Sequence, residues 1–325
     1  MILGVEIGGT KLQFGLLDPS APVAKGPDGP HSYPVWTYHH ALPIHRPDGA
    51  TGILAHINEQ VETLLKQWTI SAVGIGFGGP LNAQQGVITT SHQVAGWTDF
   101  PLADWFQGRF GVRPVLLNDC DAAALGEDVF GAGREASRTM YVTVGTGVGG
   151  GLIISGGVDG GSRPAMMEIG HVRVGLNGNT VEDMVSGLGL SARALALAES
   201  IAAESPHSSA AKQVLEAHAG MLLDGKWLAA RAVDHCPIAL ETIRTGVEAL
   251  GWALASTATL VAPEVIVVGG GIASMPDPLF WPPLRRAFET HLFGPLQGHV
   301  FLSPTALGAD SVVFGAVEAA RRGNV

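Results

Sequence analysis

Two adjacent polar residues, Asn118 and Asp119, stand where a buried strand is expected to give way to a helix. Val115 to Leu117 is a short apolar run typical of a buried strand, and Ala122 to Leu125 has the composition of a helix. A carboxylate at the carboxyl end of a parallel strand lies where open α/β folds bind their ligands. Asp119 could therefore be a general base, a metal ligand or only a helix N-cap. Such a residue taken alone is most often a cap.

A glycine turn, Gly8-Gly9-Thr10-Lys11, joins two apolar runs near the start of the chain. Two glycines let a backbone approach a phosphate closely, and the Thr hydroxyl and Lys ammonium add donors. An ordinary hairpin turn explains the same residues equally well. The turn lacks the Walker spacing and leads into a strand, so it is not a P-loop.

Two further glycine clusters follow apolar runs. The turn Gly145-Thr146-Gly147 lies in VTVGTGVGGGLII, which weakly repeats the first hairpin, VEIGGTKLQFGLL. With Gly150 it matches G-x-G-x-x-G, but the following Leu152 to Ile154 continues as a strand, which disfavours a dinucleotide site and a dehydrogenase. Gly269-Gly270-Gly271 ends the predicted buried strand Glu264 to Val268 and would let a flat ligand or another backbone lie close.

Glu168 and His171, three residues apart in EIGH, could together accept and donate hydrogen bonds to neighbouring hydroxyls. A surface salt bridge is the alternative, and the spacing is not that of a zinc metalloprotease. His39, His40 and His45 have no ligand-like spacing, and we expect them to be solvated.

The elements that must position these residues alternate between strands and helices. Helical spacing of apolar residues predicts a helix over 51–68, and residues 72–77 read as a buried strand. An Ala-rich helical region extends to about residue 260, and residues 18–50 read as an extended hairpin or surface excursion. The pattern predicts an α/β fold of two domains, with residues 1–117 and the C-terminal helix 306–325 in the smaller and 118–305 in the larger.

The composition is that of a globular protein. The 325 residues are 46% hydrophobic and 15% charged, with 45 glycines, which indicates many tight turns. A net charge of −10 without a Lys/Arg run argues against nucleic acid as a partner. Two cysteines without metal or redox spacing, no evident signal peptide and no membrane-length apolar stretch predict a cytoplasmic protein that makes no membrane contact.

The ordered motifs EIGGTK, GGPLN, NDCDAAALGE, VGTGVGGGLI, EIGH, VEDMVSG, VVGGGIA and LGADSVVFGA resemble the ROK family of sugar kinases and repressors. The resemblance covers nearly the whole chain and implies the actin/hexokinase-like (ribonuclease H-like) fold, with a cleft between two domains. It implies ATP-dependent phosphorylation of a hexose, most often glucose, with Mg²⁺ as cofactor. Fructose, mannose or an N-acetylhexosamine are alternative substrates, and a non-catalytic sugar-binding regulator is an alternative function. A homodimer is also implied.

The resemblance assigns roles to residues. Asp119 would be the catalytic base, and Asn118, Glu168, His171 and Glu182 would bind sugar hydroxyls. The remaining assignments are to the nucleotide, at Gly8, Gly9, Thr10, Lys11, Gly145, Thr146, Gly147, Gly269, Gly270 and Gly271.

The chain departs from the family pattern in three places. Glu6 stands where the family more often has Asp, which alters the reach of a carboxylate that would help hold Mg²⁺. The span VRVGLNGNTVEDMV lacks the cysteines of the family's zinc motif, so no zinc is expected and His171 need not bind a metal. The first phosphate turn begins near residue 5, which leaves no room for the repressors' DNA-binding domain.

Overall fold

The computed structural model describes residues 1–20, 23–25, 32–91, 93–159, 167–175, 178–220 and 223–323. The chain divides into two compact units, and each is treated by itself. The first comprises Met1–Tyr141, Gly151–Met167 and Thr305–Val325, and the second comprises Val142–Gly150 and Glu168–Pro304. The domain boundary expected at residues 117 and 118 stays a prediction.

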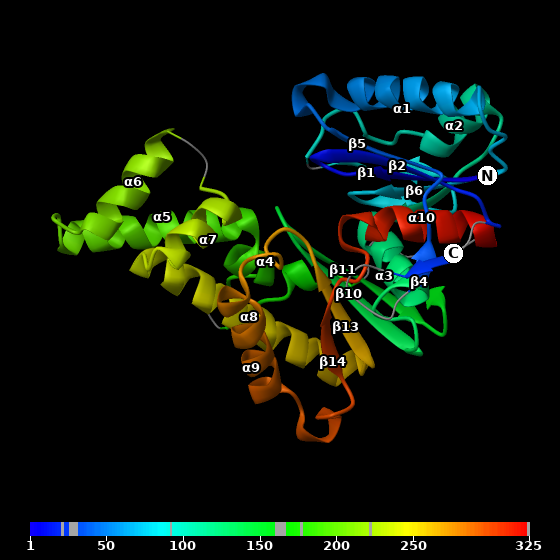
Figure 1. The fold of residues 1–325 in the computed structure, drawn as a ribbon. Helices are drawn as coiled ribbons and strands as arrows, with labels where there is room; N and C mark the ends of the chain where they lie inside the picture. Colours follow the sequence, from blue (N-terminus) through cyan, green and yellow to red (C-terminus); the bar gives the residue numbers. More distant parts are fainter. Residues whose placement is uncertain are drawn as a thin grey trace. The chain divides into compact units, whose positions relative to one another are not determined.

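A five-stranded sheet in the order β5-β2-β1-β6-β9 forms the centre of the first unit (Figure 1). β1 pairs antiparallel with β2 and parallel with β6, and β6 pairs parallel with β9. The pairing places Ile7 beside Phe77, and Phe77 beside Asn118, so the carboxyl ends of these three strands are aligned. The strands are β1 (Ile2–Ile7), β2 (Lys11–Leu17), β5 (Tyr38–Pro43), β6 (Ala72–Phe77) and β9 (Val115–Asn118).

Helices cover both faces of this sheet (Figure 1). Apolar residues of α1 and α2 pack with Val5, Phe14 and other sheet residues in one buried cluster. On the opposite face α10 lies directly against the sheet, because a Cβ on Gly74 would be 1.8 Å from the Ala316 carbonyl oxygen. The helices are α1 (Gly49–Leu65), α2 (Leu102–Phe110), α3 (Asp119–Phe130) and α10 (Ser311–Arg322).

The second sheet repeats this order as β12-β11-β10-β13-β14. A strand pair joined by a glycine turn, β10 and β11, occupies the same place as β1 and β2, which confirms the internal repeat. β13 and β14 are parallel, as are β6 and β9. The strands are β10 (Arg138–Val144), β11 (Val148–Ile154), β12 (Gly157–Val158), β13 (Val265–Gly269) and β14 (Phe301–Pro304).

The second unit carries the predicted helical region. Along α8, the longest of its described helices, Ile243, Val247, Leu250 and Leu254 are buried. Among the residues that the structure describes, no helix has the length and apolar character needed to cross a membrane. The helices are α4 (Val181–Val185), α5 (Gly187–Glu204), α6 (Ser209–Gly220), α7 (Gly225–Val233), α8 (Pro237–Val261) and α9 (Trp281–His291).

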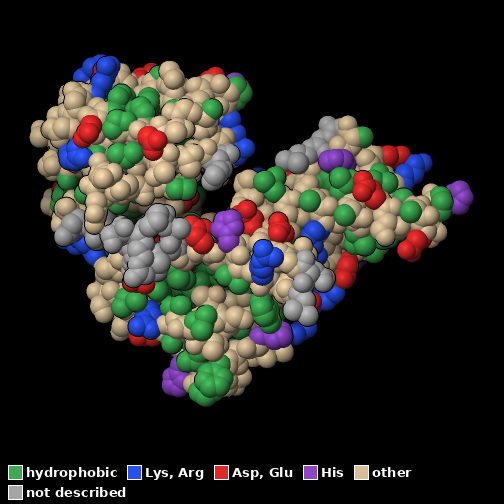
Figure 2. All heavy atoms as spheres, turned by 180° about the vertical axis from the view of Figure 1, so that it is seen from behind, with side chains coloured by type: hydrophobic (Ala, Val, Ile, Leu, Met, Phe, Trp, Pro, Cys, Tyr) green, Lys and Arg blue, Asp and Glu red, His purple; other side chains and the backbone are tan. Residues whose placement is uncertain are grey.

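Within the stretch 18–50, β3 (Val23–Lys25) and β4 (Ser32–Pro34) pair antiparallel, whereas β5 belongs to the central sheet. The expectation of an extended hairpin or surface excursion over the whole stretch is therefore wrong for β5. Residues 21–22 and 26–31 of this stretch lie outside the described residues. A second small hairpin is formed by β7 (Leu81–Asn82) and β8 (Val87–Ile88). On the face drawn in Figure 2, Lys and Arg side chains are scattered among Asp and Glu.

Candidate active site

The aligned strand ends of the first sheet bring the predicted first phosphate turn and Asp119 together. Gly8, Gly78 and Asp119 directly follow β1, β6 and β9. A Cβ on Gly78 would lie 3.2 Å from Asp119 Oδ2 and 3.5 Å from the Gly8 Cα. The Asp119 carboxylate therefore lies close to the phosphate turn, at the edge where parallel strands place ligands.

Asn118, and not Asp119, is the N-cap of α3. The side-chain oxygen of Asn118 accepts a hydrogen bond from the Cys120 backbone N–H at 2.8 Å, and Asp119 is the first helical residue. Asp119 Oδ1 accepts from the same N–H at 2.9 Å, which fixes the orientation of its carboxylate. The interpretation of Asp119 as only a cap is therefore wrong, because its neighbour performs that function.

The first glycine turn is a hairpin held from several sides. The Gly8 N–H donates to the Lys11 carbonyl oxygen at 2.9 Å, and Arg46 Nε donates to the Gly9 carbonyl oxygen at 2.9 Å. The Thr10 carbonyl oxygen accepts from the Ile44 N–H at 2.9 Å. These bonds fix the backbone of the turn, while the Thr10 side chain is exposed.

Glu6 and Lys11 give this edge its charge. Glu6 Oε2 lies 2.8 Å from Lys11 Nζ, but the contact lacks hydrogen-bond geometry, so this buried oxygen has the ion pair alone. Burial raises the pKa of Glu6 from 4.5 to about 7. The Lys11 ammonium opposes that shift, and the carboxylates of Asp119 and Asp310 add to it. Negative charge is thus concentrated around one lysine.

The second glycine turn, Gly145–Gly147, is fixed by the segment that carries Glu182. Glu182 Oε2 accepts from the Val148 N–H at 2.8 Å, immediately after the turn. A Cβ on Gly147 would lie 2.6 Å from the same oxygen, and the Gly187 N–H donates to the Gly145 carbonyl oxygen at 2.8 Å. One oxygen of this predicted sugar ligand is therefore already bonded to the backbone of the phosphate turn.

The glycines Gly269 to Gly271 meet the same turn. Gly270 has a φ of +93°, and a Cβ there would lie 2.4 Å from the Val144 carbonyl oxygen at the end of β10. The Ile272 N–H donates to that oxygen at 2.9 Å. Only glycine allows this approach without strain, so the cluster packs one backbone against another, whereas Gly271 has open space where a side chain would stand.

Glu168 and His171 lie at a 3-10 turn, Ile169–His171, with both side chains exposed. The turn packs close to the start of β11, since a Cβ on Gly170 would be 2.1 Å from the Val148 carbonyl oxygen. The described contacts of these two residues include no ion pair between their side chains, so the salt-bridge alternative is wrong. The second unit therefore gathers EIGH, Glu182 and both of its glycine clusters around β10 and β11.

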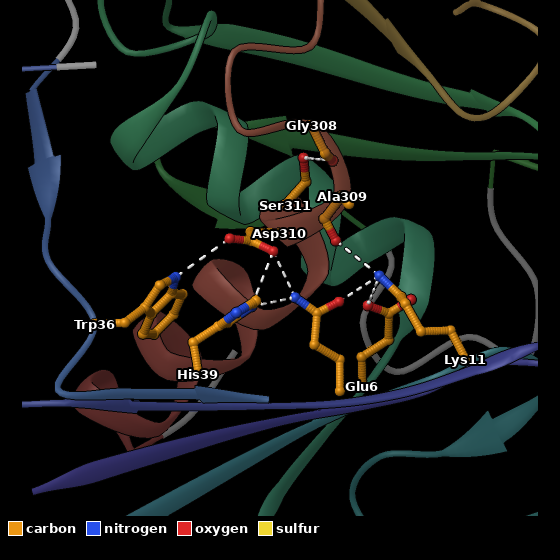
Figure 3. A network of polar contacts seen from close by, with 9 residues as sticks. Glu6, Lys11, Trp36, His39, Gly308, Ala309, Asp310 and Ser311 are labelled. Atoms are coloured by element: carbon orange, nitrogen blue, oxygen red, sulfur yellow. Dashed lines mark hydrogen bonds and ion pairs between the residues drawn. The ribbon is translucent and has the colours of Figure 1, made fainter. Parts of the chain in front are cut away.

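Three polar residues near the site were not predicted from the sequence. Gln13 and Asp310 lie in one hydrogen-bond network with Lys11 (Figure 3). His39 contacts this network from an exposed position, which agrees with the expectation that it is solvated. Glu127 is buried and binds the loop before α10. Asp310 lies in the motif LGADSVVFGA and Glu127 in the motif NDCDAAALGE, and their place in these motifs is the sequence feature that could have indicated a role at the site.

Two sheets of equal strand order, each with a glycine turn between its leading strands, define an actin/hexokinase-like ATPase fold. The chain belongs to the ROK family, which it matches over residues 2–322. It is similar to the glucokinase of Streptomyces coelicolor, with 29% identity over 303 residues that cover 90% of this chain and 89% of that protein. It is also similar to the N-acetylgalactosamine kinase of Shewanella sp. strain ANA-3, at 28% identity over 90% of this chain and 88% of the other.

A solved structure of a ROK family glucokinase from Streptomyces griseus, in complex with glucose and AMPPNP, superposes with a TM-score of 0.77. The two chains share 28% identity, and the alignment covers 99% of each. The predicted family and fold are thus confirmed.

Proposed function

We propose that this protein transfers the γ-phosphoryl group of ATP to a hydroxyl group of a hexose, with glucose as the preferred substrate. The observation that carries the proposal is the position of the Asp119 carboxylate beside the Gly8 turn, at the aligned carboxyl ends of β1, β6 and β9. Phosphoryl transfer needs a proton acceptor near the attacking hydroxyl and donors near the phosphate oxygens. The similarity to glucokinases supports glucose as the substrate.

In this proposal Asn118 orients the sugar and Asp119 accepts the proton of the attacking hydroxyl. The sugar oxygen forms a bond to the γ-phosphorus as the bond from that phosphorus to ADP breaks. Glu168, His171 and Glu182 are proposed to bind further hydroxyls of the sugar. For Glu182 the oxygen bonded to Val148 leaves the other oxygen for this role.

The nucleotide is proposed to contact the three glycine turns. Gly8, Gly9, Thr10 and Lys11 would bind one part of the phosphate chain and Gly145–Gly147 another. Gly269–Gly271 would lie beside the adenosine, where the open space at Gly271 suits a flat ring.

Mg²⁺ would neutralise phosphate charge when bound. Among the described residues there is no group of three or more His, Cys, Asp or Glu side chains arranged for a metal, so a cation here would depend on phosphate oxygens for other ligands. Glu6 fits such a cation, because its buried Oε2 accepts no hydrogen bond. The absence of zinc, the homodimer and the cytoplasmic location stay predictions.

A coupled ADP-release assay tests the substrate class. Glucose, fructose, mannose, N-acetylglucosamine and N-acetylgalactosamine would be compared at saturating MgATP, and glucose should give the highest kcat/KM. The similarity to an N-acetylgalactosamine kinase makes that sugar the second candidate. If no sugar stimulates ADP release while calorimetry detects sugar binding, the protein is a sugar-binding regulator and the proposal is wrong.

A further inference from the structure

The Lys11 ammonium is held by the segment that precedes α10. Lys11 Nζ donates to the Ala309 carbonyl oxygen at 2.8 Å and to Gln13 Oε1, and it lies 2.8 Å from Glu6 Oε2 (Figure 3). An ammonium group has three N–H donors. Two are used in these hydrogen bonds, and the Glu6 contact lacks hydrogen-bond geometry. The third N–H is therefore available to donate to a phosphate oxygen, in place of the contact with Glu6.

Gln13 connects this ammonium to Asp310. Its side chain is only 1% exposed, and its Nε2 donates to Asp310 Oδ1 while its Oε1 accepts from Lys11. Asp310 Oδ2 also accepts from Trp36 Nε1 at 3.3 Å. His39 Nε2 lies 2.6 Å from Gln13 Nε2 and 3.1 Å from Asp310 Oδ1. Because Lys11 fixes the amide nitrogen as the donor, His39 Nε2 accepts that bond, and its 3.1 Å contact with Asp310 Oδ1 is then not a hydrogen bond.

The chemistry of this bridge explains why the residue is glutamine. Lys11 offers donors alone and an ionised Asp310 offers acceptors alone. A carboxamide of this length, with its oxygen facing the ammonium and its nitrogen facing the carboxylate, satisfies both without adding charge. A glutamate would place two carboxylates against each other, and a methionine would leave both neighbours without this partner.

We propose that Gln13 is a positioning residue for nucleotide binding, which holds the Lys11 ammonium in place through Asp310. This inference rests on the proposed function, in which Lys11 binds a phosphate. An ammonium on a four-carbon stem loses rotamer freedom when it binds a ligand. The bonds to Gln13 and Ala309 remove that freedom beforehand, so the cation is oriented before the nucleotide arrives.

A double variant can restore the donor–acceptor match between positions 13 and 310. It therefore distinguishes an effect on the position of Lys11 from a general loss of stability. Gln13→Glu sets two carboxylates together, whereas Asp310→Asn keeps an oxygen that accepts from the Gln13 amide. In the double variant Q13E/D310N the carboxylate at position 13 accepts from Lys11 and the new amide at position 310 donates to it. The net charge equals that of the wild type.

The measurement is the Kd of Mg·AMPPNP by calorimetry without sugar, with thermal unfolding of each variant. In Q13E the facing carboxylates should displace the Lys11 ammonium and raise the Kd about tenfold. The Kd of D310N should stay within about twofold of the wild-type value, and that of the double variant within about threefold. Gln107→Glu, an exposed change on α2 that adds the same charge, should bind as the wild type does.

Equal Kd values for Q13E and wild type, or a double variant no better than Q13E, would overturn the positioning role. If Q13E fails to fold, Gln13→Met keeps the side-chain length and should raise the Kd about fivefold. An unchanged Kd for Q13M with a lowered unfolding temperature would show a purely structural role. A wild-type protein that does not bind Mg·AMPPNP would overturn the proposed function as well.

Discussion

The carboxyl group of Glu6 titrates close to neutral pH in the folded protein. Its pKa is raised from 4.5 to about 7, first of all by burial. A carboxyl whose folded pKa is raised binds more protons when folded, so its contribution makes unfolding easier as pH rises from 4.5 to 7. Relative to Glu6→Gln, the wild type should lose on the order of 3 kcal/mol of unfolding free energy across that window.

Urea unfolding of both proteins at several pH values measures this difference. Glu59→Gln, an exposed change on α1, is the matched control and should follow the wild type at every pH. A constant difference between E6Q and wild type from pH 5 to pH 8 would mean that Glu6 is ionised throughout, contrary to the pKa of about 7.

Asn118 and Asp119 show what residue types alone can establish. The apolar run before them and the alanines after them predicted the strand end and the helix start, and both are confirmed. Which of the two caps the helix depends on where the backbone changes from the extended to the helical conformation, and composition does not determine this to one residue. Gln13 contacts Lys11 two residues before it, but His39 and Asp310 lie 26 and 297 residues away in the sequence, so no local pattern could reveal the whole network.

Helix α3 and the loop before α10 are joined by one buried carboxylate. Glu127 accepts from the backbone N–H groups of Ala306 and Leu307, both at 3.1 Å, and from Ser311 Oγ at 2.9 Å. The same loop continues to Ala309 and Asp310, which contact the Lys11 network. Glu127 thus connects the helix that begins at Asp119 with the segment that holds Lys11.

Glu127→Gln should therefore destabilise the fold, since an amide nitrogen would face buried N–H donors. Loss of these bonds predicts about 3 kcal/mol less unfolding free energy, measured by urea denaturation. Glu248→Gln on α8 removes an exposed ion pair with Arg244 and should cost less than about 1 kcal/mol. Equal effects of the two substitutions would show that the Glu127 bonds contribute little.

Over the whole chain, the two sheets use the same strand order and the same glycine-turn device. The repeated motifs predicted this duplication, because each turn needs glycine and each flanking strand needs an apolar run. The residues that make up each compact unit could not be predicted from these motifs. Helix α3 follows residue 118 in sequence but belongs to the first unit, because it packs with α10.

In the proposed reaction, the proton of a hexose hydroxyl passes to Asp119 during phosphoryl transfer. Asp119→Asn keeps the shape of the side chain and removes its basicity. Asp121→Asn removes the same charge from the same helical turn and should retain activity within about twofold of wild type.

The most direct test is the yield of hexose phosphate and ADP, quantified together by mass spectrometry for wild type, D119N and D121N. Wild type and D121N should form one hexose phosphate per ADP, whereas D119N should be slower by about 10² to 10⁴ with sugar affinity largely unchanged. A D119N protein that forms hexose phosphate at the wild-type rate would exclude Asp119 as the base.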